Sequence, residues 1–408
     1  MGTKRVKGDC GECHTMLEDR ISQLPDSLIH HIFSSLPTIY LVRMGRLSKR
    51  WRRMWVSTPF LYFDDFCIIA LNKNVRTRDM VLKLMTYYLR YRKHCMQIPD
   101  TFLLSFRFDT HHMSASNSSD IRIIDDWLNF VVKSKVKELA LSFKKYCLPQ
   151  FILNASSLTL LKLTYLKLVA PTPSTFPSLK VLSLLSFESD VKSLQNLISG
   201  CPIIEELYLR TYALGPIDFV VSGTLKNLSL SVDFNEQWLN GLISRLPLLE
   251  RLALESHTMK NISIRSHSLK YVFIKSFDTV EEVALTITTP NLVCLHLTCY
   301  SRNIIVVEAP NLLEASLTLE DRGGMLKASL MDLVHLLSNL NFLKKMMLTI
   351  RDEEVLILLK SIRKYCPSPL LNLKHLKVKI RDGRLYETAK LPDSLLWCAP
   401  CLETLEMV

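Results

Sequence analysis

The 408-residue sequence contains only 11 glycines, which are too few for much phosphate-cradling backbone. It has no G-x-x-x-x-G-K-[ST], G-x-S-x-G or H-E-x-x-H motif, and the adjacent acid pairs Asp64-Asp65 and Asp125-Asp126 fit surface charge better than an acid/base couple. No uninterrupted apolar run of about 18 residues occurs, and no apolar segment follows the basic stretch Thr3–Lys7 as it would in a secretory signal. We therefore expect a soluble, non-catalytic protein that works inside the cell, in the nucleus and/or cytoplasm, without a membrane partner.

The 11 cysteines follow no disulfide framework, and without an export signal we interpret them as reduced thiols. Cys10-Gly11-Glu12-Cys13-His14 has the spacing of c-type haem attachment, but that chemistry belongs to exported or organellar proteins. No second Cys/His pair lies nearby at zinc-finger spacing. His111 and His112 are assigned to a surface loop at Thr110–Ser119. We predict no metal site and no cofactor.

Three short helices are expected near the N-terminus. The first begins at Pro25 and ends before Pro37, which lacks the N–H that a helix interior needs. Thr38 is a plausible N-cap for a second helix, which Gly45 interrupts, and a third begins near Ser48.

Helices this short bury little apolar surface between themselves, although Trp51 and Trp55 lie among them. The three-helix unit is therefore expected to bind a partner. The alternative is a small helical cap that packs on the rest of the chain.

Residues 66–135 show a weaker pattern. Met80–Lys93 and Ile121–Val132 have helical periodicity, and Thr101–Phe108 alternates apolar and polar residues like a strand.

The remaining sequence repeats the pattern apolar-x-x-apolar-x-apolar, from Val136-Leu139-Leu141 to Leu402-Leu405-Met407. About a dozen copies follow one another roughly 20 to 30 residues apart. Apolar residues at i and i+2 point the same way from a strand, and stacked strands of this kind bury a continuous spine in a parallel-sheet solenoid. Helical periodicity between copies predicts helices on the outer side at Val191–Ser199, Asn235–Ser244, Leu330–Leu340 and Glu353–Tyr365.

The N-terminal motifs resemble an F-box, and their wording is close to that of plant F-box/leucine-rich-repeat proteins. The matching pieces are D-R-I-S-Q-L-P-D at Asp19–Asp26, S-S-L-P-T at Ser34–Thr38, L-S-K-R-W-R-R-M-W at Leu47–Trp55 and P-F-L-Y-F-D-D at Pro59–Asp65. Met44–Gly45–Arg46 departs from the small polar residues usual in the family.

The resemblance implies an α/β chain in which a three-helix F-box precedes a leucine-rich-repeat solenoid. A parallel sheet would line the concave side, with helices and loops on the convex side. The expected division is a disordered tail at 1–18, the F-box at 19–65, a linker or N-terminal cap of the repeat array at 66–135, and the solenoid at 136–408. The last copy ends at Val408, so we expect either a longer chain or a partner that covers this end of the sheet.

For function, the resemblance implies a substrate-recognition adaptor of an SCF-type (Skp–cullin–F-box) ubiquitin ligase. The F-box would dock on the Skp adaptor, and through it on the cullin/RING core, while the repeats bind a target protein for ubiquitination. The expected docking residues form an apolar set with a basic rim: Leu24, Pro25, Ile29, Ile32, Leu36, Leu41, Val42, Leu47, Lys49, Arg50 and Trp51.

Target contacts are expected from strand residues that face away from the leucine spine. In the central copies these are Tyr208, Arg210, Arg251, Tyr271, Phe273 and Lys275, a mixture of aromatic and cationic side chains that is common in binding hot spots. One alternative is a leucine-rich-repeat scaffold that acts without the ligase. Another is a protein that binds nucleic acid or another polyanion, which the net charge of +12 suggests, although no nucleic-acid-binding motif occurs.

Overall fold

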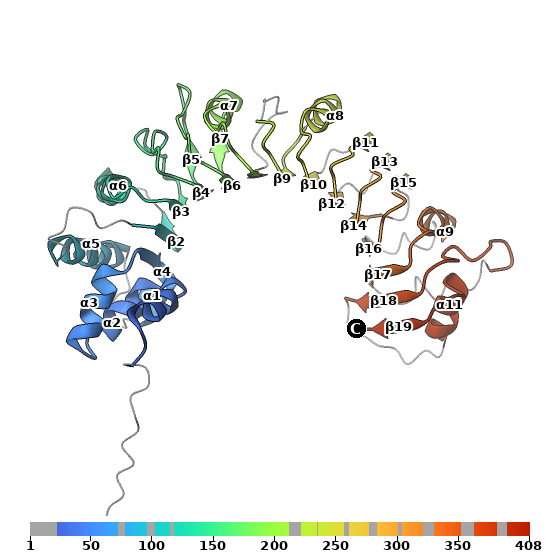
Figure 1. Ribbon diagram of the computed structural model, residues 1–408, viewed down its shortest axis with the longest axis horizontal. Helices are drawn as coiled ribbons and strands as arrows, with labels where there is room; N and C mark the ends of the chain where they lie inside the picture. Colours follow the sequence, from blue (N-terminus) through green and yellow to red (C-terminus); the bar gives the residue numbers. More distant parts are fainter. Residues whose placement is uncertain are drawn as a thin grey trace, which may run out of the picture.

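A computed structural model describes residues 23–71, 78–95, 103–114, 118–211, 222–234, 236–256, 261–276, 284–300, 304–320, 330–351, 363–381 and 390–408. The predicted tail with Cys10–His14 and most of the predicted helix Glu353–Tyr365 lie outside these residues. Figure 1 shows an arch, with the N-terminal helices at one end and the C-terminal strands at the other.

The three predicted N-terminal helices are present as α1 (Asp26–Ser34), α2 (Thr38–Met44) and α3 (Lys49–Ser57). The Ser48 side chain caps α3 by accepting a hydrogen bond from the Trp51 backbone N–H at 3.2 Å. The prediction for Thr38 is wrong, because Pro37 occupies the N-cap position of α2. Thr38 Oγ1 instead accepts a hydrogen bond from the Tyr62 N–H at 2.9 Å, which ties α2 to the first strand.

Within the described residues, one parallel sheet of 14 strands lines the inner side of the arch (Figure 1). In spatial order its strands are β1 (Phe60–Asp64), β2 (Ser105–Ser114), β3 (Glu138–Lys144), β4 (Leu160–Thr164), β6 (Val181–Leu185), β8 (Glu206–Arg210), β9 (Asn227–Ser231), β10 (Arg251–Ser256), β12 (Tyr271–Ser276), β14 (Cys294–Cys299), β16 (Glu314–Leu319), β17 (Lys345–Ile350), β18 (His375–Ile380) and β19 (Thr404–Met407). From β3 onward, every strand of this sheet lies on one predicted copy of the repeat, so the solenoid prediction is confirmed.

The leucine pair of each repeat builds the core. In β8, Leu207 and Leu209 are buried while Tyr208 between them is only partly covered, and Leu207 lies beside Leu228 of β9. Each buried leucine stabilises the fold by about 1.5–3 kcal/mol relative to an exposed one. Because neighbouring strands supply the other walls of this core, no single repeat is stable alone.

The outer side of the arch carries helices and short strands (Figure 1). The helices are α6 (Ser118–Lys133), α7 (Val191–Ser199), α8 (Glu236–Ser244), α9 (Leu330–Ser338) and α11 (Lys390–Cys398). The short strands form two further sheets, β5 (Lys167–Leu168) with β7 (Glu188–Ser189), and β11 (Asn261–Arg265) with β13 (Ala284–Thr288) and β15 (Ile304–Glu308). The sequence predicted these helices apart from α11, but none of these outer strands.

The sheet begins earlier than the repeats do. β1 pairs with β2 and β2 pairs with β3, and α4 (Asp65–Leu71) and α5 (Arg78–Cys95) lie beside this end. The expected loop at Thr110–Ser119 is wrong, since β2 continues to Ser114 and therefore includes His111 and His112. The domain boundaries expected from the sequence stay a prediction.

The N-terminal helices are held firmly on this end of the sheet. The Trp55 ring of α3 stacks on Tyr91 of α5, with ring centroids 5.7 Å apart. Arg92 of α5 is buried and donates a hydrogen bond to the Thr58 carbonyl just after α3, and burial lowers its pKa to about 10. The helical unit thus shares contacts with the array, as the cap alternative expected.

A ladder of alternating charges crosses the start of five neighbouring strands. Lys180, Glu205, Lys226, Glu250 and Lys270 each precede one strand, from β6 to β12. Their ion pairs measure 2.9 Å for Lys180–Glu205, 2.8 Å for Lys226–Glu205 and 2.9 Å for Lys270–Glu250. Hydrogen bonds from Lys226 and then from Lys180 lower the pKa of Glu205 to about 2.

Glu205 should therefore stay ionised far below the ordinary glutamate pKa of about 4.3. A lowered folded-state pKa means that the ladder's contribution to stability is complete above about pH 4.3 and disappears as the pH falls through about 2. Lys226→Met should raise the pKa of Glu205 toward its ordinary value, which a carbon-13 NMR titration of labelled glutamate carboxyls measures. Lys49→Met, on α3, is the control and should leave the Glu205 titration unchanged.

Gly45 has a packing role that its sequence context did not reveal. Its φ of −59° suits any residue, so no backbone conformation requires glycine here. A Cβ at this position would lie 2.8 Å from Trp55 Cδ1 and 2.9 Å from Trp55 Nε1. The absence of a side chain lets the end of α2 approach the indole of α3.

Gly45→Ala should lower the free energy of unfolding by about 1–3 kcal/mol, the usual cost of overpacking a core. Urea unfolding followed by tryptophan fluorescence measures this change. Gly223→Ala is the matched control, because a Cβ there meets nothing within 4 Å. Equal stability of the two variants would contradict the packing role of Gly45.

Candidate functional site

The predicted docking residues of the helical unit differ widely in exposure. Ile29, Leu41 and Trp51 are buried, while Leu24, Leu36, Val42 and Arg50 are half-buried, and Pro25, Ile32, Leu47 and Lys49 are exposed. The expectation that all of these residues form one contact surface is therefore wrong for Ile29, Leu41 and Trp51. Their side chains face the interior of the unit, where a partner cannot reach them in this conformation.

The buried residues form a small core of their own. The Trp51 ring lies against Phe33 of α1, with ring centroids 5.7 Å apart, and only 4% of Trp51 is exposed. Ile29, Leu41, Met54 and Trp55 complete this cluster. Trp51 thus fixes α3 on α1, so the indole that the sequence assigned to a partner stabilises the unit instead.

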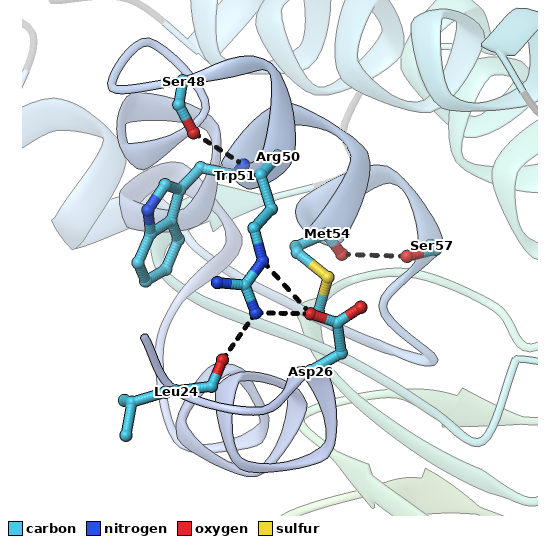
Figure 2. A network of polar contacts seen from close by, with 7 residues as sticks. All are labelled: Leu24, Asp26, Ser48, Arg50, Trp51, Met54 and Ser57. Carbon is cyan, nitrogen blue, oxygen red and sulfur yellow. Dashed lines mark hydrogen bonds and ion pairs between the residues drawn. The ribbon is translucent and has the colours of Figure 1, made fainter. Parts of the chain in front are cut away.

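Arg50 also works inside the helical unit, as Figure 2 shows. Its guanidinium reaches back to the start of α1, with Nη2 donating to Asp26 Oδ1 at 2.6 Å and to the Leu24 carbonyl at 2.5 Å. Nε donates to the same Asp26 oxygen at 3.2 Å. Arg50 therefore fixes the segment that carries Leu24, a role that its placement in a basic rim did not anticipate.

Several large apolar side chains of the unit are exposed, and the three most exposed are aliphatic. Leu47 is 71% exposed, and Leu28 and Ile32 of α1 are 49% and 41% exposed. Leu28 and Ile32 are four residues apart and therefore neighbours on one helix face. Leu28 was missing from the predicted set although this i, i+4 spacing could have identified it. We define Leu28, Ile32 and Leu47 as the apolar docking patch.

Basic side chains lie close to these residues in the sequence. Lys49, Arg52 and Arg53 on α3 are all exposed. Cations beside an apolar patch would speed association with an acidic partner and would lose this effect at high salt.

The predicted target-binding residues lie on the inner face of the sheet. On β12, Tyr271 and Phe273 are exposed, and the Arg251 guanidinium of β10 lies 4.3 Å from the centre of the Tyr271 ring. Lys275, further along β12, forms a 3.1 Å ion pair with Glu255 of β10. The structure therefore brings Arg251, Tyr271, Phe273 and Lys275 together on two adjacent strands.

Tyr208 and Arg210 lie on β8, separated from β10 by β9. The Tyr208 hydroxyl donates to Glu206 at 2.7 Å, and burial together with this carboxylate raises the pKa of Tyr208 to about 12. β9 presents the small side chain of Ser229 between Tyr208 and Ala253. The six predicted residues thus form one surface across β8 to β12, which we call the central concave surface.

In the parts of the chain that the structure describes, no cluster of three or more His, Cys, Asp or Glu side chains could bind a metal ion. No helix in those parts is long and apolar enough to cross a membrane.

Comparison with protein families gives two matches. The F-box domain matches residues 21–63, and the family described as "FBD-associated F-box protein At5g56370, LRR repeats" matches residues 124–225 and 220–316. The first match covers the helical unit and β1, and the second covers the central part of the repeat array.

Similar proteins occur in Arabidopsis thaliana. F-box/LRR-repeat protein 13 is 29% identical over 249 residues, which cover 59% of this chain and 52% of that protein. F-box/FBD/LRR-repeat protein At1g51370 is 30% identical over 254 residues, covering 60% and 52%. F-box/LRR-repeat protein 25 is 29% identical over 197 residues, covering 47% and 67%. The matched part of this chain spans about half the length of the first two relatives. With its three N-terminal helices followed by a curved parallel sheet of leucine repeats, the chain carries an F-box domain and leucine-rich repeats similar to those of the Arabidopsis F-box/LRR-repeat proteins.

Proposed function

We propose that this protein is a substrate-recognition adaptor of an SCF-type ubiquitin ligase, in which the F-box docks on a Skp adaptor and the repeats bind a target protein. The observation that carries this proposal is the apolar docking patch, Leu28, Ile32 and Leu47, on an F-box that is fixed to one end of the sheet. Leu28 and Ile32 are exposed on neighbouring turns of α1, and adjacent exposed apolar side chains are a common mark of a protein–protein interface.

The rest of the molecule supports a binding role and not a catalytic one. The central concave surface combines aromatic rings with cations, the composition of many interface hot spots. The described cysteines are free thiols, which supports a location inside the cell, in the nucleus and/or cytoplasm. Several lysines of the inner sheet are paired with glutamates, as in Lys275–Glu255, and this favours recognition of a mixed protein surface over a polyanion.

The docking proposal predicts that Ile32→Asp together with Leu47→Asp weakens binding to a recombinant Skp adaptor at least tenfold. Each substitution places a charge in an apolar contact, and tenfold corresponds to about 1.4 kcal/mol. Surface plasmon resonance with the full chain measures the affinity, and the melting temperature should stay unchanged because both positions are exposed. Leu371→Asp, at another exposed leucine far along the chain, is the control. An unaltered affinity in the double variant would refute the docking proposal.

Point substitutions test docking more cleanly than deletion of the F-box does. β1 directly follows the three helices and is the first strand of the sheet. Deletion of the first 65 or so residues would therefore remove a strand and expose the edge of β2.

For target binding, Tyr271→Ala and Arg251→Ala should each remove proteins from the set that co-purifies from cells, while Skp binding is retained. The stacked pair offers a rigid aromatic contact beside a cation, and truncation of such a hot spot often costs 2 kcal/mol or more. Quantitative mass spectrometry of affinity-purified complexes gives the measurement. Arg265→Ala, an exposed arginine on β11 of the outer side, is the control. An unchanged set of bound proteins in both variants would exclude this surface.

A further inference from the structure

A pocket of about 410 Å³ opens on the inner face of the sheet beyond the central concave surface. Its lining comes from β14, β16, β17, β18 and β19. Its volume falls in the range of pockets that enclose small ligands or side chains of a partner. The residues predicted from the sequence end at β12, so this pocket was not anticipated.

The pocket exists because β16 carries a small side chain, Ser316, on the inner face of the sheet. Ser316 points to the inner face between His296 of β14 and Met347 of β17. Ala315 takes the place that a leucine holds in most repeats, with Leu295 and Met346 beside it. The short side chain of Ser316 between the longer His296 and Met347 leaves a hollow, with Met347 as an apolar wall.

The charges around the pocket compensate one another. Glu314 pairs with Lys345 at 2.5 Å, and Lys377 pairs with Glu406 at 3.1 Å. A charged ligand group inside the pocket would have to compete with these pairs and lose its own hydration. An uncharged, apolar group meets no such cost.

Four further polar residues of the wall form two pairs. His375 Nδ1 lies 2.8 Å from Thr404 Oγ1, and Cys294 Sγ lies 3.3 Å from His296 Nε2. Burial raises the pKa of the Cys294 thiol, with a smaller contribution from Glu314. Cys294 is thus held as a neutral, weakly polar side chain and not as a nucleophile. The Met347 thioether also lines the pocket, and a thioether adapts well to apolar partners.

The pocket is continuous with the aromatic end of the central concave surface. Phe273 of β12 lies directly beside His296 of β14 in the sheet register, with ring centroids 5.9 Å apart. Two strand spacings, about 10 Å, separate β12 from β16, which three residues of an extended peptide span. A segment that contacts Tyr271 and Phe273 can therefore place its next side chains in the pocket.

We propose that this pocket is the anchor site for the target protein and takes one large uncharged side chain, aromatic or aliphatic, from an extended segment that crosses β12, β14 and β16. This inference rests on the proposed function only in that the concave face binds a protein. Specificity then has two parts, an apolar anchor at Ser316 and Met347 and a polar, aromatic contact at Arg251 and Tyr271.

The test is selection of a random 12-residue peptide library, displayed on phage, against the full chain. The selected peptides should share one large apolar residue, and replacement of that residue by alanine should reduce their affinity at least tenfold. Ser316→Phe fills the pocket and should cause a similar loss, measured by fluorescence anisotropy of a labelled peptide. Ala140→Phe makes a comparable change at the same strand position in β3, outside the pocket, and should leave the affinity unchanged.

Met347→Lys provides a second variant, since it places a charge in the pocket without filling it. Failure to select any peptide, selection of peptides without a shared apolar residue, or unaltered affinity in both pocket variants would overturn the proposal. Skp binding, measured in parallel on the same proteins, should be normal in every variant. If the unmodified chain does not bind the Skp adaptor at all, the docking proposal is contradicted. Failure of the pocket proposal and failure of the docking proposal therefore give different results.

Discussion

Burial of the leucine spine between adjacent strands is the interaction on which the whole molecule depends. A strand such as β8 has two leucines that face the core but cannot form a core alone, so its stability comes from β6 and β9 on either side. The same constraint leaves alternate side chains free on the inner face, because successive residues of a strand point to opposite sides. The proposed binding surface is thus a direct result of the way in which the core is built, and its residues can vary without loss of the fold.

The F-box follows the same rule at the end of the array. Its own helices bury only a small cluster around Trp51, and the remaining support comes from Tyr91, Arg92 and the first strand. The packing that the cap alternative expected is therefore present, and binding to a partner stays a prediction. The helical unit packs on the rest of the chain through one side and still leaves Leu28, Ile32 and Leu47 uncovered on another.

Much of this architecture could be predicted from the sequence. Pairs such as Leu207 and Leu209 locate the strands because a spacing of two residues has one simple physical meaning in a repeat, and Pro37 and Ser48 mark helix ends through local chemistry. Long-range pairing was harder to predict. The local sequence of Phe60–Asp64 does not indicate that this segment joins the sheet by pairing with β2. The outer strand β15 likewise forms by pairing with β13, which its local sequence does not indicate.

The site residues show the same limit. Their types were informative, since aromatic and basic residues do face the inner side, as at Arg251 and Tyr271. Whether a residue such as Trp51 or Arg50 faces a partner or its own chain depends on how the helices pack, which the local pattern does not determine. The pocket could not be predicted because it arises from a small side chain, Ser316, that leaves a hollow only when longer side chains flank it on the neighbouring strands.

Because β1 is part of the same sheet as the repeats, the number of strands sets the distance between the F-box and the pocket. Nine strand steps lead from β1 to β14, where the pocket begins, and each step adds about 4.8 Å along the sheet. Loss or gain of a single repeat between them would shift the anchored segment by one step and rotate it by the twist of one strand, with every contact residue unchanged. Related proteins with the same surface chemistry but a different number of repeats would therefore hold their cargo at a different position relative to the F-box.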